Sequence, residues 1–242
     1  MHRCTNMRAF LVFLVLAGAC NTRAQVPDTV RIKSGGVDKY IVGIHTKKGV
    51  YSGHVEYFDT TWTLRQKGNA IKGKWDGPIE YFDSTGTLLR RSLAKKGKLE
   101  GMATDYRSNG LVWRETPMHK GKAHGEFKQY YANGMLELKA PYRDGKMSGE
   151  TIVWDSTGAK ANGDVVVAGT GGASLRFHCV DGHPEGKMVG KRKDGQFSVI
   201  GMFSAGLPVG DFIYYNFNGT PVRKDTYKEG RFVKSVPLNE FP

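Results

Sequence analysis

The sequence predicts an all-β protein, an elongated and twisted antiparallel meander of stacked β-hairpin repeats in a single sheet. Three observations favour this fold. Glycines recur with a step of 24 residues, turn pairs such as Asn-Gly lie between them, and aromatic or β-branched residues fill the intervening segments. A fixed period of this length is typical of repeat architectures, in which each unit packs on its neighbours.

Two glycine series divide the chain into units. The leading series places unit starts near residues 53, 77, 101, 125, 149, 186 and 210. The second series follows 20 residues later, at Gly73, Gly97, Gly121, Gly145, Gly169, Gly206 and Gly230. The unit that starts at Gly149 is 13 residues longer than the others. We therefore expect an insertion at about 159–185, with an extra strand pair around a glycine turn.

The unit that starts at Gly77 shows how one repeat forms a hairpin. Residues 78–82 suit a pleated strand, and Asp83-Ser-Thr-Gly86 is turn chemistry in which glycine supplies a positive φ. Residues 88–93 return as the second strand, and Lys96-Gly97-Lys98 turns into the next unit.

The first unit departs from this pattern. Trp62 stands where the other hairpin turns carry glycine, which predicts a wider or distorted turn.

Aromatic side chains recur five residues after the leading glycines. Equivalent positions of stacked hairpins align, so we expect an aromatic ladder that forms the core of the sheet and is interrupted at Lys191. The alternative is an aromatic face that binds sugar rings or peptide. The ladder residues are Phe58, Phe82, Tyr106, Tyr130, Trp154 and Tyr215.

Basic residues follow the second glycine series by one position. In stacked hairpins they would form a row along one sheet edge with a spacing of roughly 10 Å, thickened by Lys72, Lys96 and Lys120. This row predicts a surface for polyanions, and the alternative is solvated lysines that block edge pairing. The candidate polyanion-binding residues are Lys74, Lys98, Lys122, Lys146 and Arg231.

The N-terminus predicts export. Two arginines precede an apolar stretch over 9–19, and Thr22-Arg23-Ala24 offers small residues at a cleavage site before Gln25. The stretch is too short to span a bilayer, which takes about 20 residues. Cys20 in Leu16-Ala-Gly-Ala-Cys20 resembles a lipoprotein box, so a lipid anchor at Cys20 is the alternative to a soluble exported protein.

The expected organisation has four parts. They are a signal peptide at 1–24, an N-terminal lead-in strand at 25–48, hairpin repeats at 49–234 and a C-terminal tail at 235–242. Removing the leader takes away three arginines and no acid, which lowers the formal charge from +13 to +10. It also leaves Cys179 as the single cysteine, which excludes an internal disulfide.

The repeat itself resembles a known family. The pattern Gly-x-x-x-(Tyr/Phe)-(Tyr/Phe)-x-x-(Asn/Thr)-Gly, followed by (Lys/Asp)-Gly-Lys-x-x-Gly, is similar to the MORN-repeat variant family, whose bacterial members are often labelled YwqK-type antitoxins. Good examples are the units over 125–149 and 210–230, and the resemblance covers roughly 48–233. It implies a twisted sheet of hairpins that serves as a scaffold or membrane-associated module.

No motif predicts catalysis, a cofactor or a metal. His178, Cys179, Asp181 and His183 form the densest group of potential ligands, but they lack zinc-type spacing. Gly169-Thr-Gly171-Gly172 lacks the lysine and the helix of a phosphate loop.

The sequence therefore favours an exported, non-enzymatic scaffold that binds a protein or an envelope component. A peripheral binder of anionic lipid or glycan is the alternative, followed by antitoxin-like partner binding and by an enzyme with a pocket at 164–185. We expect no specific nucleic-acid binding and no transmembrane segment after processing.

Overall fold

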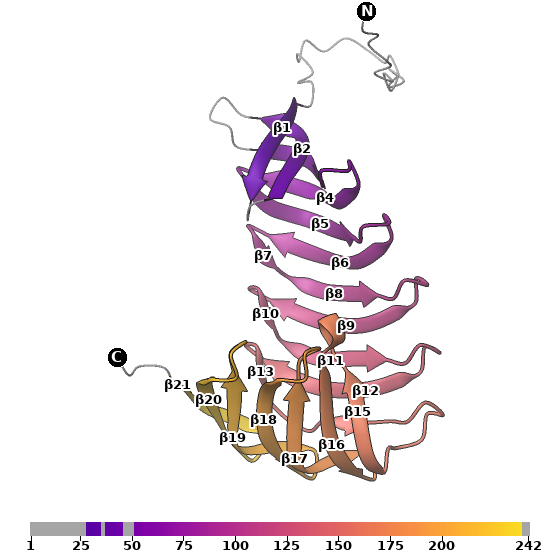
Figure 1. Ribbon diagram of the computed structural model, residues 1–242, viewed down its shortest axis with the longest axis vertical. Coiled ribbons are helices and arrows are strands. Elements are labelled where there is room, and N and C mark those ends of the chain that lie inside the picture. The colour runs from indigo at the N-terminus through magenta and orange to yellow at the C-terminus, as the bar shows by residue number, and fades with distance from the viewer. Residues whose placement is uncertain (1–27, 35–36, 46–50, 239–242) are drawn as a thin grey trace, which may run out of the picture.

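The computed structural model describes residues 28–34, 37–45 and 51–238 (Figure 1). Within these residues the chain forms two antiparallel sheets, one of 14 strands and one of 7. Neighbouring strands mostly follow one another in chain order, so the predicted all-β meander is confirmed. The prediction of a single sheet is wrong, because the chain leaves the first sheet after Val153 and begins a second one at Gly163. No helix among the described residues is long and apolar enough to cross a membrane.

The strands have the following bounds. The first sheet contains β1 (Asp28–Ser34), β2 (Val37–His45), β3 (Tyr51–Phe58), β4 (Leu64–Ile71), β5 (Lys74–Phe82), β6 (Leu88–Lys95), β7 (Lys98–Leu99), β8 (Gly101–Tyr106), β9 (Val112–His119), β10 (Lys122–Ala123), β11 (Gly125–Tyr130), β12 (Leu136–Arg143), β13 (Lys146–Met147) and β14 (Ile152–Val153). The second contains β15 (Gly163–Ala168), β16 (Ser174–Val180), β17 (His183–Lys191), β18 (Phe197–Ser204), β19 (Leu207–Tyr215), β20 (Pro221–Lys228) and β21 (Arg231–Pro237), with the 3₁₀ turn η1 (Thr170–Gly172) between β15 and β16.

The two ends of the repeat region differ from the expected boundaries. The segment 25–48, expected as one lead-in strand, holds β1 and β2, which pair as a hairpin. At the other end, β21 pairs with β20 and reaches into the segment expected as a tail.

The hairpins share one register. Gly77 lies opposite Ala94, Gly101 opposite Met118, and Gly125 opposite Tyr142, so each leading glycine pairs with the residue 17 positions later. Because this register repeats, equivalent residues of neighbouring units form columns across the sheet.

Two-residue turns connect one hairpin to the next. In the turn after β6, Lys96 and Gly97 both have positive φ, at 51° and 82°, which is the geometry of a type I′ turn. The amide of Gly97 donates a hydrogen bond of 2.8 Å to the carbonyl of Trp75, and the amide of Gly121 donates one of 2.9 Å to the carbonyl of Leu99. These bonds stack each turn on the turn before it.

The same turn geometry corrects the predicted boundaries after Gly149. Asp181 and Gly182 have φ of 48° and 79°, whereas Gly169 has φ of −103°. Gly182, and not Gly169, therefore belongs to the second glycine series. Gly163, with φ of 83°, takes the place of a leading glycine, although it pairs with Cys179, 16 positions later instead of 17. The 37 residues over 149–185 are thus one shortened hairpin over 149–162, followed by a further unit of 23 residues over 163–185.

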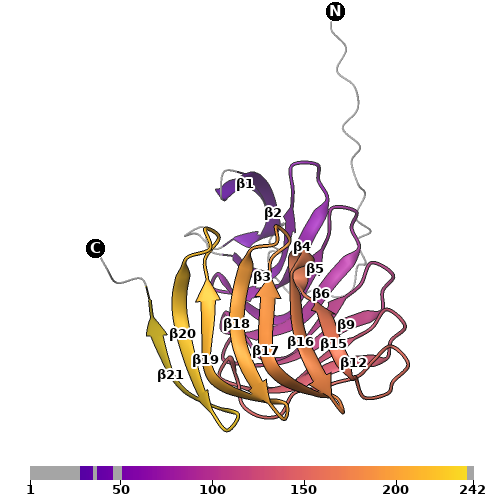
Figure 2. The same ribbon diagram turned by 60° about the horizontal axis from the view of Figure 1, so that its bottom comes forward.

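The shortened hairpin is the point at which the chain changes sheets. The first strand of this hairpin is the short β14. Its two arms are paired only by an isolated bridge between Trp154 and Lys160. The chain then enters β15, and the second sheet folds back over the end of the first sheet around β11–β13 (Figures 1 and 2). The predicted strand pair around a glycine turn is present as β15 and β16.

The main core lies between the two sheets. Leu138 and Val153 of the first sheet pack with Phe177, Phe203 and Phe212 of the second. A separate small cluster in the N-terminal half joins Val55 and Ala70 to the partly buried Tyr57 and Trp75. We call the face of the first sheet that meets the second sheet the inner face, and the opposite one the outer face.

The turn at Trp62 is less distorted than the sequence predicts. The amide of Trp62 donates to the carbonyl of Asp59 at 3.1 Å, as the amide of Gly86 does to Asp83 at 3.2 Å. Trp62 adopts a φ of 59°, so a tryptophan takes the left-handed position that glycine holds elsewhere.

Backbone contact between the sheets makes Gly206 a sensitive position. A Cβ there would lie 2.6 Å from the carbonyl oxygen of Thr151, while a Cβ at Gly186 would meet nothing within 4 Å. Both glycines have positive φ. Gly186→Ala should lower the free energy of unfolding by about 1–2 kcal/mol, from the left-handed backbone alone. Gly206→Ala should lower it by about 1–3 kcal/mol more, because the backbone must also shift.

Chemical denaturation of the two variants checks this prediction. Equal losses of stability in Gly206→Ala and Gly186→Ala would contradict the close approach of the sheets at Gly206.

Candidate functional site

The aromatic ladder lies on the outer face, away from the core. Successive side chains of a strand alternate between faces, so residues two and five positions after a leading glycine point to opposite sides. In β5, Ile79 is 1% exposed on the inner side, while the ammonium of Lys67 lies 5.4 Å from the ring centre of Phe82. Each ladder residue is only half-buried. The prediction that the ladder forms the core is therefore wrong, because the buried columns start two residues after the leading glycines.

Charged side chains flank the ladder rings. The hydroxyl of Tyr130 donates to the Glu115 carboxylate at 2.7 Å, and the ammonium of Lys139 lies 5.9 Å from the Trp154 ring centre. Burial, with a smaller contribution from Glu115, raises the pKa of Tyr130 to about 12. The outer face thus offers aromatic rings beside charges of both signs.

Hydrogen bonds between units fix the backbone of the ladder. The Arg107 guanidinium donates to the carbonyl of Tyr130 at 2.7 Å, and the Tyr131 hydroxyl donates to the carbonyl of Trp154 at 2.8 Å. Arg192 makes the equivalent bond to Tyr215 in the second sheet. Each donor directly follows the ladder position of its own unit, so neighbouring units are held at a fixed spacing.

Three residues of the predicted lysine row do form a column. A Cβ at Gly97 would lie 3.5 Å from the Cβ of Lys74, and one at Gly121 would lie 4.0 Å from the Cβ of Lys98. At Gly145 the corresponding distance to the Cβ of Lys122 is 3.8 Å. Each lysine stem therefore packs on the next turn.

Lysines just before the glycines extend this column. Lys96, Lys98 and Lys120 line a depression of about 420 Å³ together with Glu100 and His119. Glu100 accepts hydrogen bonds from His119 and from the amide of Lys120, at 2.7 and 3.0 Å. The hydrogen bonds from the Lys120 amide and from the His119 ring lower the pKa of Glu100. Among the described residues, no carboxylate lies within ion-pair distance of the ammonium groups of Lys72, Lys74, Lys96, Lys98, Lys120 and Lys122.

Lys146 does not continue the column, contrary to the sequence prediction. Its ammonium lies 2.5 Å from the carboxylate of Asp225, which is fully buried, and 4.9 Å from the ring centre of Phe232. Burial raises the pKa of Asp225, but hydrogen bonds from Lys146 and Ser235 and the charge of Arg223 outweigh it and lower that pKa. Lys146 thus ties the first sheet to the second instead of facing solvent.

Arg231 is also separate from the column, because it begins β21 of the second sheet. The turns of that sheet carry Asp181, Ala205 and Glu229 before glycine, where the first sheet carries mostly lysine. The change of sheet therefore interrupts the predicted row.

The residues considered as metal ligands point to different partners. His178 pairs with Asp164 at 3.0 Å, His183 with Glu150 at 3.1 Å, and Asp181 with Lys160. The described residues contain no group of three His, Cys, Asp or Glu side chains that could hold a metal. Cys179 is 1% exposed, and burial raises the pKa of its thiol to about 11, which makes the thiol unreactive. Cys20 lies outside the described residues.

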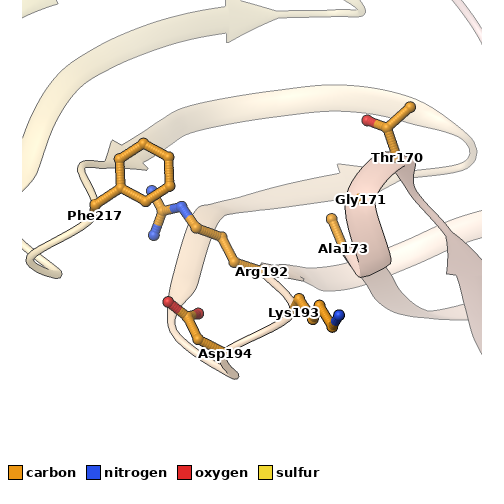
Figure 3. Close-up of a pocket in the computed structure, with 7 residues that line it drawn as sticks. All are labelled: Thr170, Gly171, Ala173, Arg192, Lys193, Asp194 and Phe217. Carbon is orange, nitrogen blue, oxygen red and sulfur yellow. The ribbon is translucent and has the colours of Figure 1, made fainter. Parts of the chain in front are cut away.

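The segment 164–185 contributes to a hollow at the hairpin-turn end of the second sheet (Figure 3). The hollow measures about 770 Å³ and is lined by Thr170, Gly171, Ala173, Arg192, Lys193, Asp194 and Phe217. The Arg192 guanidinium lies 4.9 Å from the Phe217 ring centre and donates to the carbonyls of Phe197 and Tyr215. The guanidinium of Arg192, a cation that lines the hollow, is thus already bound to backbone carbonyls.

Comparison with known families identifies one of these units. Residues 123–144 match the family model of the MORN repeat variant. Residues 123–144 are a MORN repeat. No curated protein is significantly similar to the chain.

The matched segment runs from β10 through β11 and β12 to Asp144, so one MORN repeat corresponds to one hairpin with the start of its connecting turn. The predicted resemblance to the MORN repeat variant is therefore confirmed for 123–144. The shared register gives the neighbouring units the same hairpin geometry. MORN repeats are a non-catalytic repeat type that serves as a scaffold for protein or membrane interaction.

The contact between Lys146 and Asp225 should stabilise the packing of the sheets. Lys146→Met leaves the buried carboxylate without its closest cation and should lower the free energy of unfolding by about 3 kcal/mol at pH 7. Lys122→Met, at the same position of the preceding unit, should cost little because Lys122 is exposed. Since the pKa of Asp225 is lowered by folding, the contribution is present above the unfolded pKa of about 3.9 and is lost as the pH falls below it.

Urea denaturation at pH 7 and pH 3 tests this prediction. A Lys146→Met variant as stable as Lys122→Met at pH 7 would contradict it, and so would a deficit that persists undiminished at pH 3.

Proposed function

We propose that the chain is an exported, non-enzymatic repeat scaffold that binds a protein or another envelope component through the outer face of its first sheet. The position of the ladder supports this most directly. Phe82, Tyr106 and Tyr130 lie opposite the buried columns, so packing of the two sheets does not require their rings. Aromatic rings beside charged groups are typical of the residues that dominate binding at protein interfaces.

The proposal of export rests on the sequence of 1–24, which lies outside the described residues. The mass of the mature N-terminus separates cleavage after Ala24 from a lipid anchor on Cys20. Export would give the outer face access to envelope proteins and glycans.

The proposal of a non-enzymatic role rests on the repeat type and on the local chemistry. The His178, Asp181 and His183 side chains are each paired with a different partner, and the Cys179 thiol is buried. These residues do not converge on a common point at which a substrate could react.

Photocrosslinking in intact cells tests the proposed surface. A photoreactive phenylalanine analogue at Phe82 should capture the partner, because this position lies on the outer face. The same analogue at Tyr81, the preceding residue on the inner face, is the matched control and should give little product. Adducts at Tyr81 alone, or equal adducts at both positions, would overturn the assignment of the binding face.

A second function, peripheral binding to anionic membranes, is favoured by the lysine column. Lys74, Lys98 and Lys122 stack at one edge, roughly 10 Å apart, without carboxylate partners among the described residues. Each lysine near an anionic surface contributes about 1 kcal/mol. Three such contacts would strengthen binding by about 100-fold.

Charge reversal tests this second function. The triple variant Lys74→Glu, Lys98→Glu, Lys122→Glu should bind vesicles of phosphatidylglycerol and phosphatidylcholine at least about 100-fold more weakly than the wild type. The matched control reverses Lys187, Lys193 and Lys228, which are exposed on the second sheet, and should bind nearly as well as the wild type. Equal losses in both variants would show that net charge alone, and not the column, drives binding.

A further inference from the structure

A cavity lies between the two sheets, apart from the outer face and the lysine column. It measures about 280 Å³ and is lined mainly by apolar side chains, including Phe127, Leu138, Ala140, Val167 and Met188. The first three belong to the inner face of the first sheet, and the others to the second sheet. This volume is near the lower limit of pockets that hold small ligands.

Arg114 is the one cation among the residues that line this mainly apolar cavity. Arg114 of β9 lies opposite Gln129 on the inner face, and its guanidinium carbon is 3.6 Å from the centre of the Trp113 ring. Its Nε and Nη2 atoms are buried and make no hydrogen bond with another described residue. Burial lowers the pKa of Arg114, although the group remains charged. A buried charged donor without an acceptor is costly, so this edge favours an anionic acceptor.

The free edge of Arg114 has a shape that matches a carboxylate. Nε–H and the adjacent Nη2–H point the same way and form a two-pronged donor. Elsewhere in this chain, the same two atoms of Arg91 both donate to one carboxylate oxygen, Oε1 of Glu80, at 3.0 and 2.8 Å. The hydroxyl of Thr151 lines the same cavity, is also buried, and likewise lacks a partner among the described residues.

The charges around Arg114 favour a single negative charge on the ligand. The groups that act on it electrostatically are Arg90, Arg107, Asp105 and Glu137. Asp105 lies 3.6 Å from Arg90, and Glu137 accepts a hydrogen bond from Gln129. Three arginines against two carboxylates leave a net charge of +1, which one monoanion would neutralise.

From these contacts we infer that the cavity between the sheets binds a medium-chain fatty acid, with its carboxylate on Nε and Nη2 of Arg114 and its alkyl chain among the apolar residues of both sheets. The modest volume favours a medium chain over a long one. The site is independent of the proposed scaffold function, since it uses the inner face and the second sheet.

Calorimetric titration of the purified full chain with decanoate and with decanol tests the inference. Decanoate should bind saturably, and decanol should bind at least about 10-fold more weakly because it lacks the charge that pairs with Arg114. This comparison needs no variant, so it stays informative if a substitution impairs folding. Absence of saturable decanoate binding, or equal affinity for decanol, would overturn the inference.

Two variants locate the carboxylate. Arg114→Met removes the donor edge and should weaken decanoate binding at least about 10-fold while leaving decanol binding unchanged. Arg176→Gln, at an exposed arginine of β16, is the matched control and should bind decanoate like the wild type. Unchanged decanoate binding by a folded Arg114→Met variant would contradict the placement of the carboxylate. Photocrosslinking at Phe82 tests the scaffold function and does not depend on decanoate binding. A negative result in one experiment therefore leaves the other proposal standing.

Discussion

The hydrogen bond between successive connecting turns is the constraint on which this structure depends. Each turn needs two left-handed residues, and glycine takes the second place at little steric cost. The glycine amide then reaches the carbonyl of the preceding turn, as from Gly121 to Leu99 and from Gly145 to Ala123. This bond sets the register of every following hairpin. Columns such as Lys74–Lys98–Lys122 are a consequence of it.

The same turns also join the two sheets. The carbonyls of Gly182 and Gly206 accept hydrogen bonds from the amides of Val153 and Thr151, and the Cβ position of Gly230 lies 3.6 Å from the Cα of Gly149. Turns of the second sheet therefore lie along residues 149–153, the segment that ends with β14, and they contact every second residue of it. The apolar inner faces then enclose the core, while the outer face of the first sheet keeps its ladder free for binding.

Much of this fold could be predicted from the sequence, because a period of 24 residues and turn pairs such as Asn133-Gly134 specify hairpins locally. The change of sheet could not be predicted from the spacing, because Gly169 fits the period of 24 residues while Asp181-Gly182 forms the left-handed turn. The spacing of the ladder fixes its alternation along the strands but not which face of the sheet is buried, so its position away from the core depends on the second sheet. Asp225, the ion-pair partner of Lys146, lies 79 residues further along the chain. The cavity that the Arg114 guanidinium lines exists only because the second sheet closes it. Neither feature has a local sequence signal.

The most direct test of this account is hydrogen exchange at the amides of Thr151 and Val153. Both donate across the junction at 2.8 Å, to Gly206 and Gly182 of the second sheet. If the sheets are joined as described, both amides should exchange slowly, with protection like that of the central strands. Exchange as fast as that of Ser84, an exposed turn residue, would contradict the joining of the two sheets.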